Sequence, residues 1–177
     1  AVPAIQLNHA GRKASTGCFA VGYDGQSVPE EAGGWPTMAP SEIAFGGLRT
    51  PRALSVDEIH GLVGAFAVAA GRAVAAGFQA IQIHAAHGYL ISQFLDPLSN
   101  ERDDEYGGDL TGRSRFLVEV VDAVRGAVPE GVPVLVRISA TDWAAGGWDL
   151  DQTIALSKVL KEHGVDVMDV STGGIMS

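Results

Sequence analysis

Four short apolar runs predict the strands of one parallel sheet. They cover residues 2–8, 78–84, 132–138 and 165–170, and valine and isoleucine are frequent in them. This composition is typical of parallel strands, which are buried on both faces. In the second run the alternate positions Gln82 and His84 share one face, and Ile81 and Ile83 share the other.

Three stretches with helical periodicity separate these runs. The first opens with a capping box at Ser55 to Glu58 and ends at Gly77, and the third opens at Asp149 and stops at Gly164. The apolar residues at helical spacing are Ile59, Leu62, Val63, Phe66, Ala70 and Ala73, then Leu117, Val120, Val121 and Val124, then Leu156, Val159 and Leu160. Strands separated by single helices predict an α/β fold with parallel pairing and right-handed crossovers.

Two connections are far longer than the usual link between a strand and a helix. Residues 10–54 are rich in glycine and contain several prolines without a convincing period, and residues 85–110 form the second long connection. We expect residues 10–54 to extend over the mouth of an active site. Residues 85–110 should form a tightly turning, hydrogen-bonded loop that orders the end of a strand. No repeat or interdomain linker is apparent, so we predict that residues 1–177 belong to one domain.

Composition and charge narrow the class of protein. Hydrophobic residues make up 46% and charged residues 19% of the 177 residues, which is ordinary for a soluble globular protein. The formal net charge of -9 argues against nucleic acid as the main partner. The apolar stretch 62–78 is broken by Arg72, which indicates a packed helix and no membrane span. The single cysteine, Cys18, and the lack of a signal peptide indicate a cytoplasmic location.

The segment His84-Ala-Ala-His87-Gly88-Tyr89 directly follows the apolar run 78–83. Loops at the carboxyl ends of parallel strands carry the chemistry of such folds, so two imidazoles and a phenol there predict an active site. The two histidines could instead bind zinc. A zinc site needs a third protein ligand at least, and neither a cysteine nor an obvious carboxylate stands beside them. We therefore expect no metal.

Several further segments complete a pattern. They are Gln6-Leu-Asn-His9-Ala-Gly11-Arg12-Lys13, the run from Asn100 to Gly108, and Val136-Arg137-Ile-Ser139. Taken in this order with the histidine segment, they resemble the old yellow enzyme family of FMN-dependent ene-reductases, the NADH:flavin oxidoreductases. The resemblance covers nearly the whole chain, and the His/His form resembles a branch that includes many bacterial enzymes.

The resemblance implies a parallel (β/α)8 TIM barrel, of which this chain supplies strands three to six. A complete barrel needs roughly 250 residues, and half a barrel would leave two sheet edges open. We therefore expect the chain to be a partial FMN-binding barrel domain, belonging to a polypeptide about twice as long. A small, self-contained open α/β domain is the alternative.

The same resemblance assigns roles to individual residues. His84 and His87 hydrogen-bond the carbonyl or nitro oxygen of the substrate, and Tyr89 donates a proton. Gln6 and Arg137 contact the flavin. The residues themselves allow this, because an amide offers both a donor and an acceptor and a buried arginine needs an anionic or acceptor partner. For Gln6 the alternative is a hydrogen-bonded polar residue at a strand end, and for Arg137 it is an ion pair with a carboxylate.

Other polar and aromatic residues carry weaker expectations. Lys13 and Arg12 could help to bind a nicotinamide donor or an acidic substrate, although exposed basic residues usually do neither. The segment from Ser171 to Gly174 should pass near the polyol chain of the flavin. Trp35 and Trp143 are expected to be packing aromatics or to line the substrate mouth. Cys18 is expected to be incidental.

The implied function is an oxidoreductase that transfers hydride from NADH or NADPH through FMN to the activated C=C bond of an α,β-unsaturated carbonyl or a nitroalkene. The partners are thus a small electrophilic alkene and a nicotinamide cofactor, without nucleic acid or membrane; a homo-oligomer is allowed. One alternative is the barrel part of a multidomain dienoyl-CoA reductase, trimethylamine-dehydrogenase-like enzyme or aromatic acyl-CoA hydroxylase. Another is a non-catalytic barrel fragment.

Overall fold

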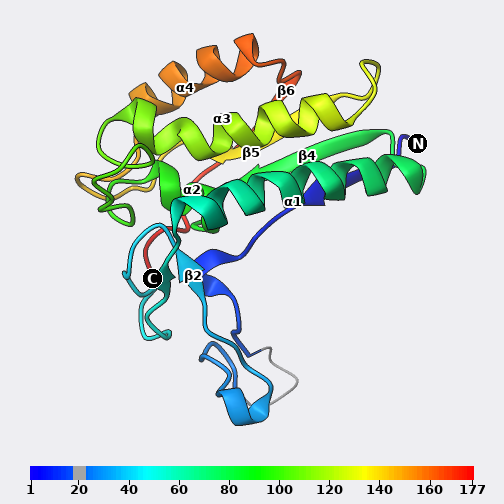
Figure 1. Ribbon diagram of the computed structural model, residues 1–177. Helices are drawn as coiled ribbons and strands as arrows, with labels where there is room; N and C mark the ends of the chain where they lie inside the picture. The colour runs from blue at the N-terminus through cyan, green and yellow to red at the C-terminus, as the bar shows by residue number, and fades with distance from the viewer. Residues whose placement is uncertain (18–22) are drawn as a thin grey trace.

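Four parallel strands form the central sheet of the computed structural model, which describes residues 1–17 and 23–177 (Figure 1). The strands are β1 (Ala4–Leu7), β4 (Ala80–Ala85), β5 (Val134–Ser139) and β6 (Val167–Ser171), paired in the order β1-β4-β5-β6. Each strand therefore lies beside its neighbour in the predicted series. This order confirms the four strand predictions and the parallel pairing.

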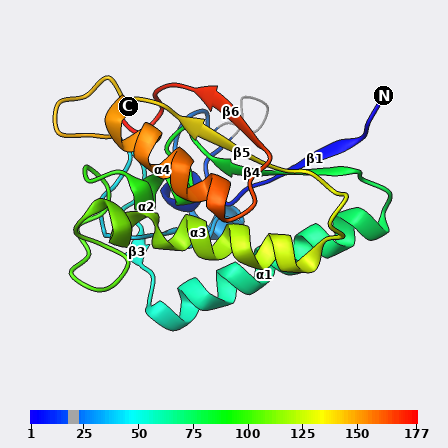
Figure 2. The same cartoon turned by 90° about the horizontal axis from the view of Figure 1, so that it is seen from above.

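Three long helices cover one face of the sheet, as the view from above shows (Figure 2). They are α1 (Val56–Ala75), α3 (Leu110–Ala127) and α4 (Leu150–Glu162). The capping box at Ser55 and Glu58 is formed, and the side chains of Asp109 and Asp149 cap the other two helices. Apolar residues of the strands and helices make one core, centred on Ile81, Ile83, Val134, Val136, Ile59, Phe66, Leu117, Val121, Leu156 and Leu160.

By length and composition alone, α1 could also cross a membrane. In the structure, Ile59, Phe66, Ala70 and Ala73 of α1 are buried in the core, while the remaining faces are partly or fully exposed. The helix predicted in this stretch is therefore present, with one of its faces packed in the core.

A short helix, α2 (Leu90–Leu95), lies inside the second long connection and was not predicted. All six of its residues are buried. A helix that is buried all round has no polar stripe, so no helical period marks it in the sequence. Its burial fixes the beginning of the connection against the sheet, directly after the histidine segment.

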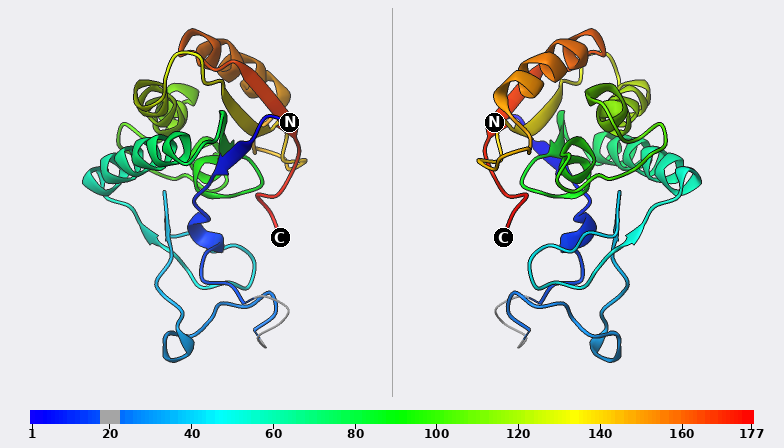
Figure 3. Two further views of the ribbon diagram at one scale, coloured as in Figure 1. Left: turned by 90° about the vertical axis from the view of Figure 1, so that its right-hand side faces the viewer. Right: turned by 90° about the vertical axis from the view of Figure 1, so that its left-hand side faces the viewer.

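The described part of the first long connection extends beyond the carboxyl ends of the strands, the side where the mouth of an active site is expected (Figure 3). It contains the 3-10 helices η1 (Gly11–Lys13) and η2 (Glu30–Ala32), and in its later part β2 (Met38–Ala39) pairs with β3 (Arg52–Ala53). The backbone amide of Leu90 donates to the carbonyl of His9 at 2.9 Å, which joins the residue just before this connection to the start of α2. Cys18 lies outside the described residues.

The face of the sheet opposite the helices carries polar side chains. Gln6, Gln82, Arg137 and Asp169 come from four different strands, and register pairs Gln6 with Gln82 and Arg137 with Asp169. In a (β/α)8 barrel the strands follow one another in sequential order and the helices cover only the outer face of the sheet. A doubly wound sheet, in contrast, has helices on both faces. The polar face is thus the inner face of the barrel wall.

Candidate active site

The two histidines and the tyrosine of the predicted site lie together at the carboxyl end of β4. The ring centroid of His84 is 5.1 Å from that of His87 and 5.1 Å from that of Tyr89, and both contacts are edge-to-face. His84 is the fifth residue of β4, whereas Tyr89 is the N-cap of α2. The strand, the turn and the buried helix therefore bring the three side chains together.

The surroundings of both imidazoles favour the neutral form. Burial first, and then the charges of His87 and Arg137, lower the pKa of His84 to about 4. Burial, Arg137 and Lys13 lower the pKa of His87 in the same direction. The Nδ1 atom of His84 accepts a hydrogen bond from the backbone amide of Ala86 at 3.1 Å. Because a neutral imidazole has one donor and one acceptor nitrogen, the Nε2 atom of His84 carries the hydrogen. This N–H group can donate a hydrogen bond to a ligand.

His87 has an unusual backbone, with a φ angle of 60° in the left-handed region. Its backbone amide donates to the hydroxyl of Ser139 at 2.9 Å, and its Nε2 atom lies 2.7 Å from the hydroxyl of Ser171. Gly88 follows with a φ of 68°, and the side chain of Gln93 donates to the carbonyl of Gly88 at 2.8 Å. Hydrogen bonds from three directions hold the turn.

Lys13 and Arg12 connect loops, which differs from the role considered for them. The Nζ atom of Lys13 donates to the carbonyl oxygen of His87 at 2.8 Å and to that of Gly174, and it lies 4.0 Å from the ring centroid of Phe45. Burial and the charge of Arg12 lower the pKa of Lys13 to about 8. Arg12 is 3% exposed and donates to the carbonyl of Ile175 at 2.7 Å. Arg12 is buried and Lys13 is partly buried, so neither side chain is a freely exposed cation.

Gln6 and Arg137 lie on the inner face of the sheet, in one polar cluster. Gln6 Nε2 donates to Gln82 Oε1 at 2.6 Å, and Gln82 Nε2 donates to Asp169 Oδ2 at 2.9 Å. The Nε atom of Arg137 lies 3.5 Å from Asp169 Oδ2, and it is buried without a hydrogen-bond partner among the described residues. The alternative of a carboxylate ion pair for Arg137 is therefore present, but it leaves that nitrogen without a hydrogen bond.

Two residues of this cluster, Gln82 and Asp169, were not predicted as site residues. The signal for both was the period of two along a strand, because Gln82 precedes His84 by two positions and Asp169 precedes Ser171 by two. That period places each of them on the inner face. It could not show that they touch, since they lie 87 positions apart in the sequence.

The prediction that Trp35 and Trp143 are packing aromatics was wrong. Trp35 is 56% exposed and Trp143 is 78% exposed, whereas Trp148 is 4% exposed and belongs to the core. The indole of Trp148 donates to the hydroxyl of Thr153 at 2.6 Å, a bond that a buried indole needs. Nothing in the sequence pattern separated the buried tryptophan from the exposed ones.

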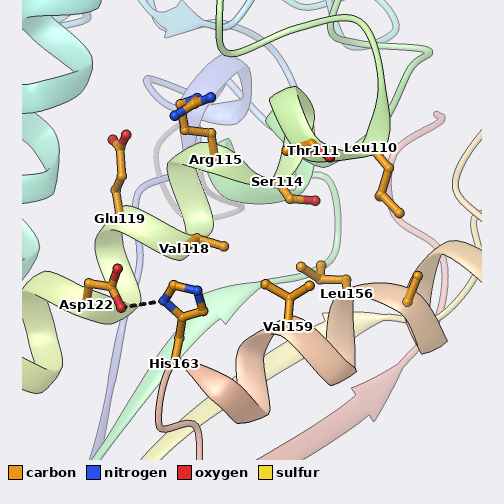
Figure 4. Close-up of a pocket in the computed structure, with 11 residues that line it drawn as sticks. Leu110, Thr111, Ser114, Arg115, Val118, Glu119, Asp122, Leu156, Val159 and His163 are labelled. Atoms are coloured by element: carbon orange, nitrogen blue, oxygen red, sulfur yellow. Dashed lines mark hydrogen bonds and ion pairs between the residues drawn. The ribbon is translucent and has the colours of Figure 1, made fainter.

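A groove of about 430 Å³ lies elsewhere, between α3 and α4 (Figure 4). Its lining comes from these two helices and from His163, whose Nδ1 atom lies 2.7 Å from Asp122 Oδ1. The groove belongs to the helical layer, outside the sheet. It includes none of the polar residues on the inner face, so it is separate from the candidate active site.

Comparison with known proteins identifies the family. Residues 1–177 match the model of the NADH:flavin oxidoreductase / NADH oxidase family. The chain belongs to this family. An NADPH dehydrogenase of Clostridium acetobutylicum is 48% identical, over 97% of this chain and 46% of that protein. The chain spans about half the length of the curated relatives it matches.

Solved structures agree with the barrel assignment. An old yellow enzyme homologue from Zymomonas mobilis superposes with a TM-score of 0.74 at 31% identity, covering 93% of this chain and 46% of that one. A 2-naphthoyl-CoA reductase superposes with a TM-score of 0.82 at 25% identity, covering 96% of this chain and 26% of that one. The predicted fold class, a parallel α/β barrel wall, is confirmed.

Proposed function

We propose that the whole protein is an FMN-dependent oxidoreductase that transfers hydride from NADH or NADPH to the activated C=C bond of an α,β-unsaturated carbonyl or a nitroalkene. The observation that carries the proposal is the cluster of His84, His87 and Tyr89, in which the ring centroids of His87 and Tyr89 each lie 5.1 Å from that of His84. Membership of the family and the named relatives support the flavin and nicotinamide parts of the proposal.

The residues on the inner face fit a flavin. Arg137 has a buried Nε atom with no hydrogen-bond partner in the part of the chain that is described, and Gln6 keeps its Oε1 atom and a second N–H group available. An amide matches a ring edge with alternating acceptors and donors, and a cation can stabilise an electron-rich reduced ring. Gln6 and Arg137 would hold FMN, and the chemistry that FMN supplies when bound is reversible acceptance of hydride.

His84 and His87 would hold the oxygen of the substrate. A neutral imidazole donates a hydrogen bond without bringing a charge, and the Nε2–H group of His84 is free for this purpose. Such donors stabilise negative charge that develops on the oxygen in the transition state, and each typically contributes about 2.7–4 kcal/mol. The hydrogen bond between the backbone amide of His87 and the hydroxyl of Ser139 fixes the turn, and it thus keeps the imidazole of His87 in place before the substrate arrives.

Tyr89 would supply the proton. Its ring stands edge-to-face with His84, so its phenol lies beside the groups that hold the oxygen. A general acid must stand within hydrogen-bond reach of the carbon that it protonates. The Nζ atom of Lys13 is 5.5 Å from the ring centroid of Tyr89, so a cation also lies near the site.

A second candidate is the barrel of a multidomain acyl-CoA reductase. The observation in its favour is the TM-score of 0.82 to 2-naphthoyl-CoA reductase. The sequence identity to that enzyme is only 25%, which weakens this candidate. The 48% identity to an NADPH dehydrogenase favours the first candidate. Iron and acid-labile sulfide in the purified protein would decide for the second, because iron–sulfur clusters in such enzymes accompany the barrel.

The test measures the two half-reactions separately by stopped flow. Replacing His84 and His87 together by alanine should weaken binding of phenols and enones strongly, while reduction of the flavin by nicotinamide changes much less. Tyr89→Phe should slow enone reduction and leave quinone turnover almost unchanged, because solvent can supply a proton to a quinone. Tyr106→Phe, the same change at a phenol that bonds Glu119 of α3 in the helical layer, should leave both half-reactions as they are. An enone reduced at full speed by Tyr89→Phe would remove Tyr89 from the mechanism, and normal phenol binding by the double variant would make the histidines structural.

A further inference from the structure

A row of polar side chains crosses the inner face from β1 to β6. Gln6 on β1 donates to Gln82 on β4, and Gln82 reaches past β5 to Asp169 on β6. On the intervening strand β5, Leu135 pairs with Gln82 of β4, and Arg137 pairs with Asp169 of β6. The amides of two strands and the carboxylate of a third therefore form one chain of hydrogen bonds beside the guanidinium of Arg137.

The carboxylate sets the direction of this chain. An ionised carboxylate only accepts hydrogen bonds, so the group of Gln82 that faces Asp169 must be its NH2 group. The oxygen of Gln82 then faces Gln6, and this oxygen in turn requires the NH2 group of Gln6. The Oε1 atom of Gln6 is thereby left for a ligand. Without Asp169 both amides could rotate by half a turn and exchange donor for acceptor.

The same carboxylate lies beside the cation. Asp169 Oδ2 is 3.5 Å from the Nε atom of Arg137, within ion-pair range but beyond the usual length of an N–H···O hydrogen bond. The two side chains are 38% and 36% exposed on the open inner face. Asp169 can therefore offset the charge of Arg137 and hold its position without forming a hydrogen bond to Nε.

We propose that Asp169 and Gln82 are positioning residues for the flavin. Asp169 orients the amide of Gln6 through Gln82, and it also offsets the charge of Arg137. This inference rests on the proposed function, in which Gln6 and Arg137 contact FMN. One carboxylate then controls both the hydrogen-bonding edge and the cation that the flavin meets.

The amide relay is tested by a double-mutant cycle on FMN binding. Gln82→Met keeps the size of the side chain and removes its hydrogen bonds, and it should raise the dissociation constant of FMN roughly 2- to 10-fold, the range for one hydrogen bond. Gln6→Met should have a similar or larger effect. The double variant should bind FMN no more weakly than Gln6→Met, because Gln82 acts through Gln6. Gln79→Met, the same change at an exposed position before β4, is the control.

The charge effect is tested on the reduction potential of the bound flavin. Asp169→Asn keeps the shape of the side chain and removes the charge, so the potential should become more positive, opposite in sign to the shift expected for Arg137→Met. Glu130→Gln removes a carboxylate charge from an exposed loop before β5, at the other end of the sheet, and should leave the potential unchanged.

Each outcome decides between the two proposals. If the unmodified protein binds no FMN, the proposed function and this inference both fail. If it binds FMN, two results overturn the inference alone: an additive loss of FMN binding in the double variant, or an unchanged potential in Asp169→Asn. Should Gln82→Met fail to fold, which its thermal unfolding would show, the potential of Asp169→Asn and its FMN dissociation constant decide the matter. Loss of the amide orientation should raise that constant as well.

Discussion

Gly88→Ala is expected to weaken substrate binding as well as to lower the stability of the fold. Gly88 has a φ of 68°, and a Cβ atom built there would lie 2.1 Å from the carbonyl oxygen of Gly174. That oxygen is backbone, so no side-chain rotation can relieve the overlap. The turn after β4 and the loop after β6 must move apart by about 0.9 Å to reach 3.0 Å, below which real Cβ contacts are essentially absent.

The required movement is large compared with the hydrogen bonds of the site. His87 precedes Gly88, and its Nε2 atom is 2.7 Å from the hydroxyl of Ser171 on β6. An added separation of that size would bring this pair to about 3.6 Å, where a hydrogen bond is lost. A misplacement of about 1 Å can reduce a rate on the order of 100-fold. The left-handed backbone costs an alanine a further 1–2 kcal/mol or so of stability.

Gly108→Ala isolates the backbone cost. Gly108 has a φ of 74°, and a Cβ atom there meets nothing within 4 Å. Gly108→Ala should therefore lose about 1–2 kcal/mol of unfolding free energy from the left-handed backbone alone. Gly88→Ala should lose more, because of the overlap with Gly174, and only Gly88→Ala should bind phenols and reduce enones poorly. Thermal unfolding measures the first quantity, and titration of the flavin absorbance with a phenol measures the second. Equal phenol affinities in the two variants would refute the reasoning.

Two further predictions concern single ionisable groups. Arg137→Met should lower the reduction potential of the flavin and slow its reduction by nicotinamide, because a neutral side chain cannot offset negative charge on the reduced ring; an unchanged potential would place Arg137 outside the site. Burial, with a contribution from Asp96, raises the pKa of Asp142 from 3.8 to about 8. Between these pH values the unfolded chain has released a proton that the folded chain keeps, so stability should fall as pH rises through this window. Asp142→Asn should flatten the melting temperature between pH 4 and about 8, and parallel curves for the two proteins would contradict the assignment.

The sequence predicted the strands, the long helices and the cluster of His84, His87 and Tyr89 for one reason. These features are local, because the period of two marks a strand, the period of 3.6 marks a helix, and a strand delivers its carboxyl-terminal residues to one place. His84, His87 and Tyr89 lie within six positions of one another. Their approach therefore required only that the strand and its turn form.

The tertiary structure alone decided the contacts between distant segments. Lys13 meets the carbonyl of His87 across 74 positions, and Gln82 meets Asp169 across 87. Each pair exists because β1, β4, β5 and β6 align their carboxyl ends and inner faces, and no local period encodes which residues of neighbouring strands then touch. The sequence by itself determined which face each residue lies on and which residues could do chemistry. Packing of the strands side by side decided which of those residues orient one another, because side-chain hydrogen bonds form only at distances that the assembled sheet sets.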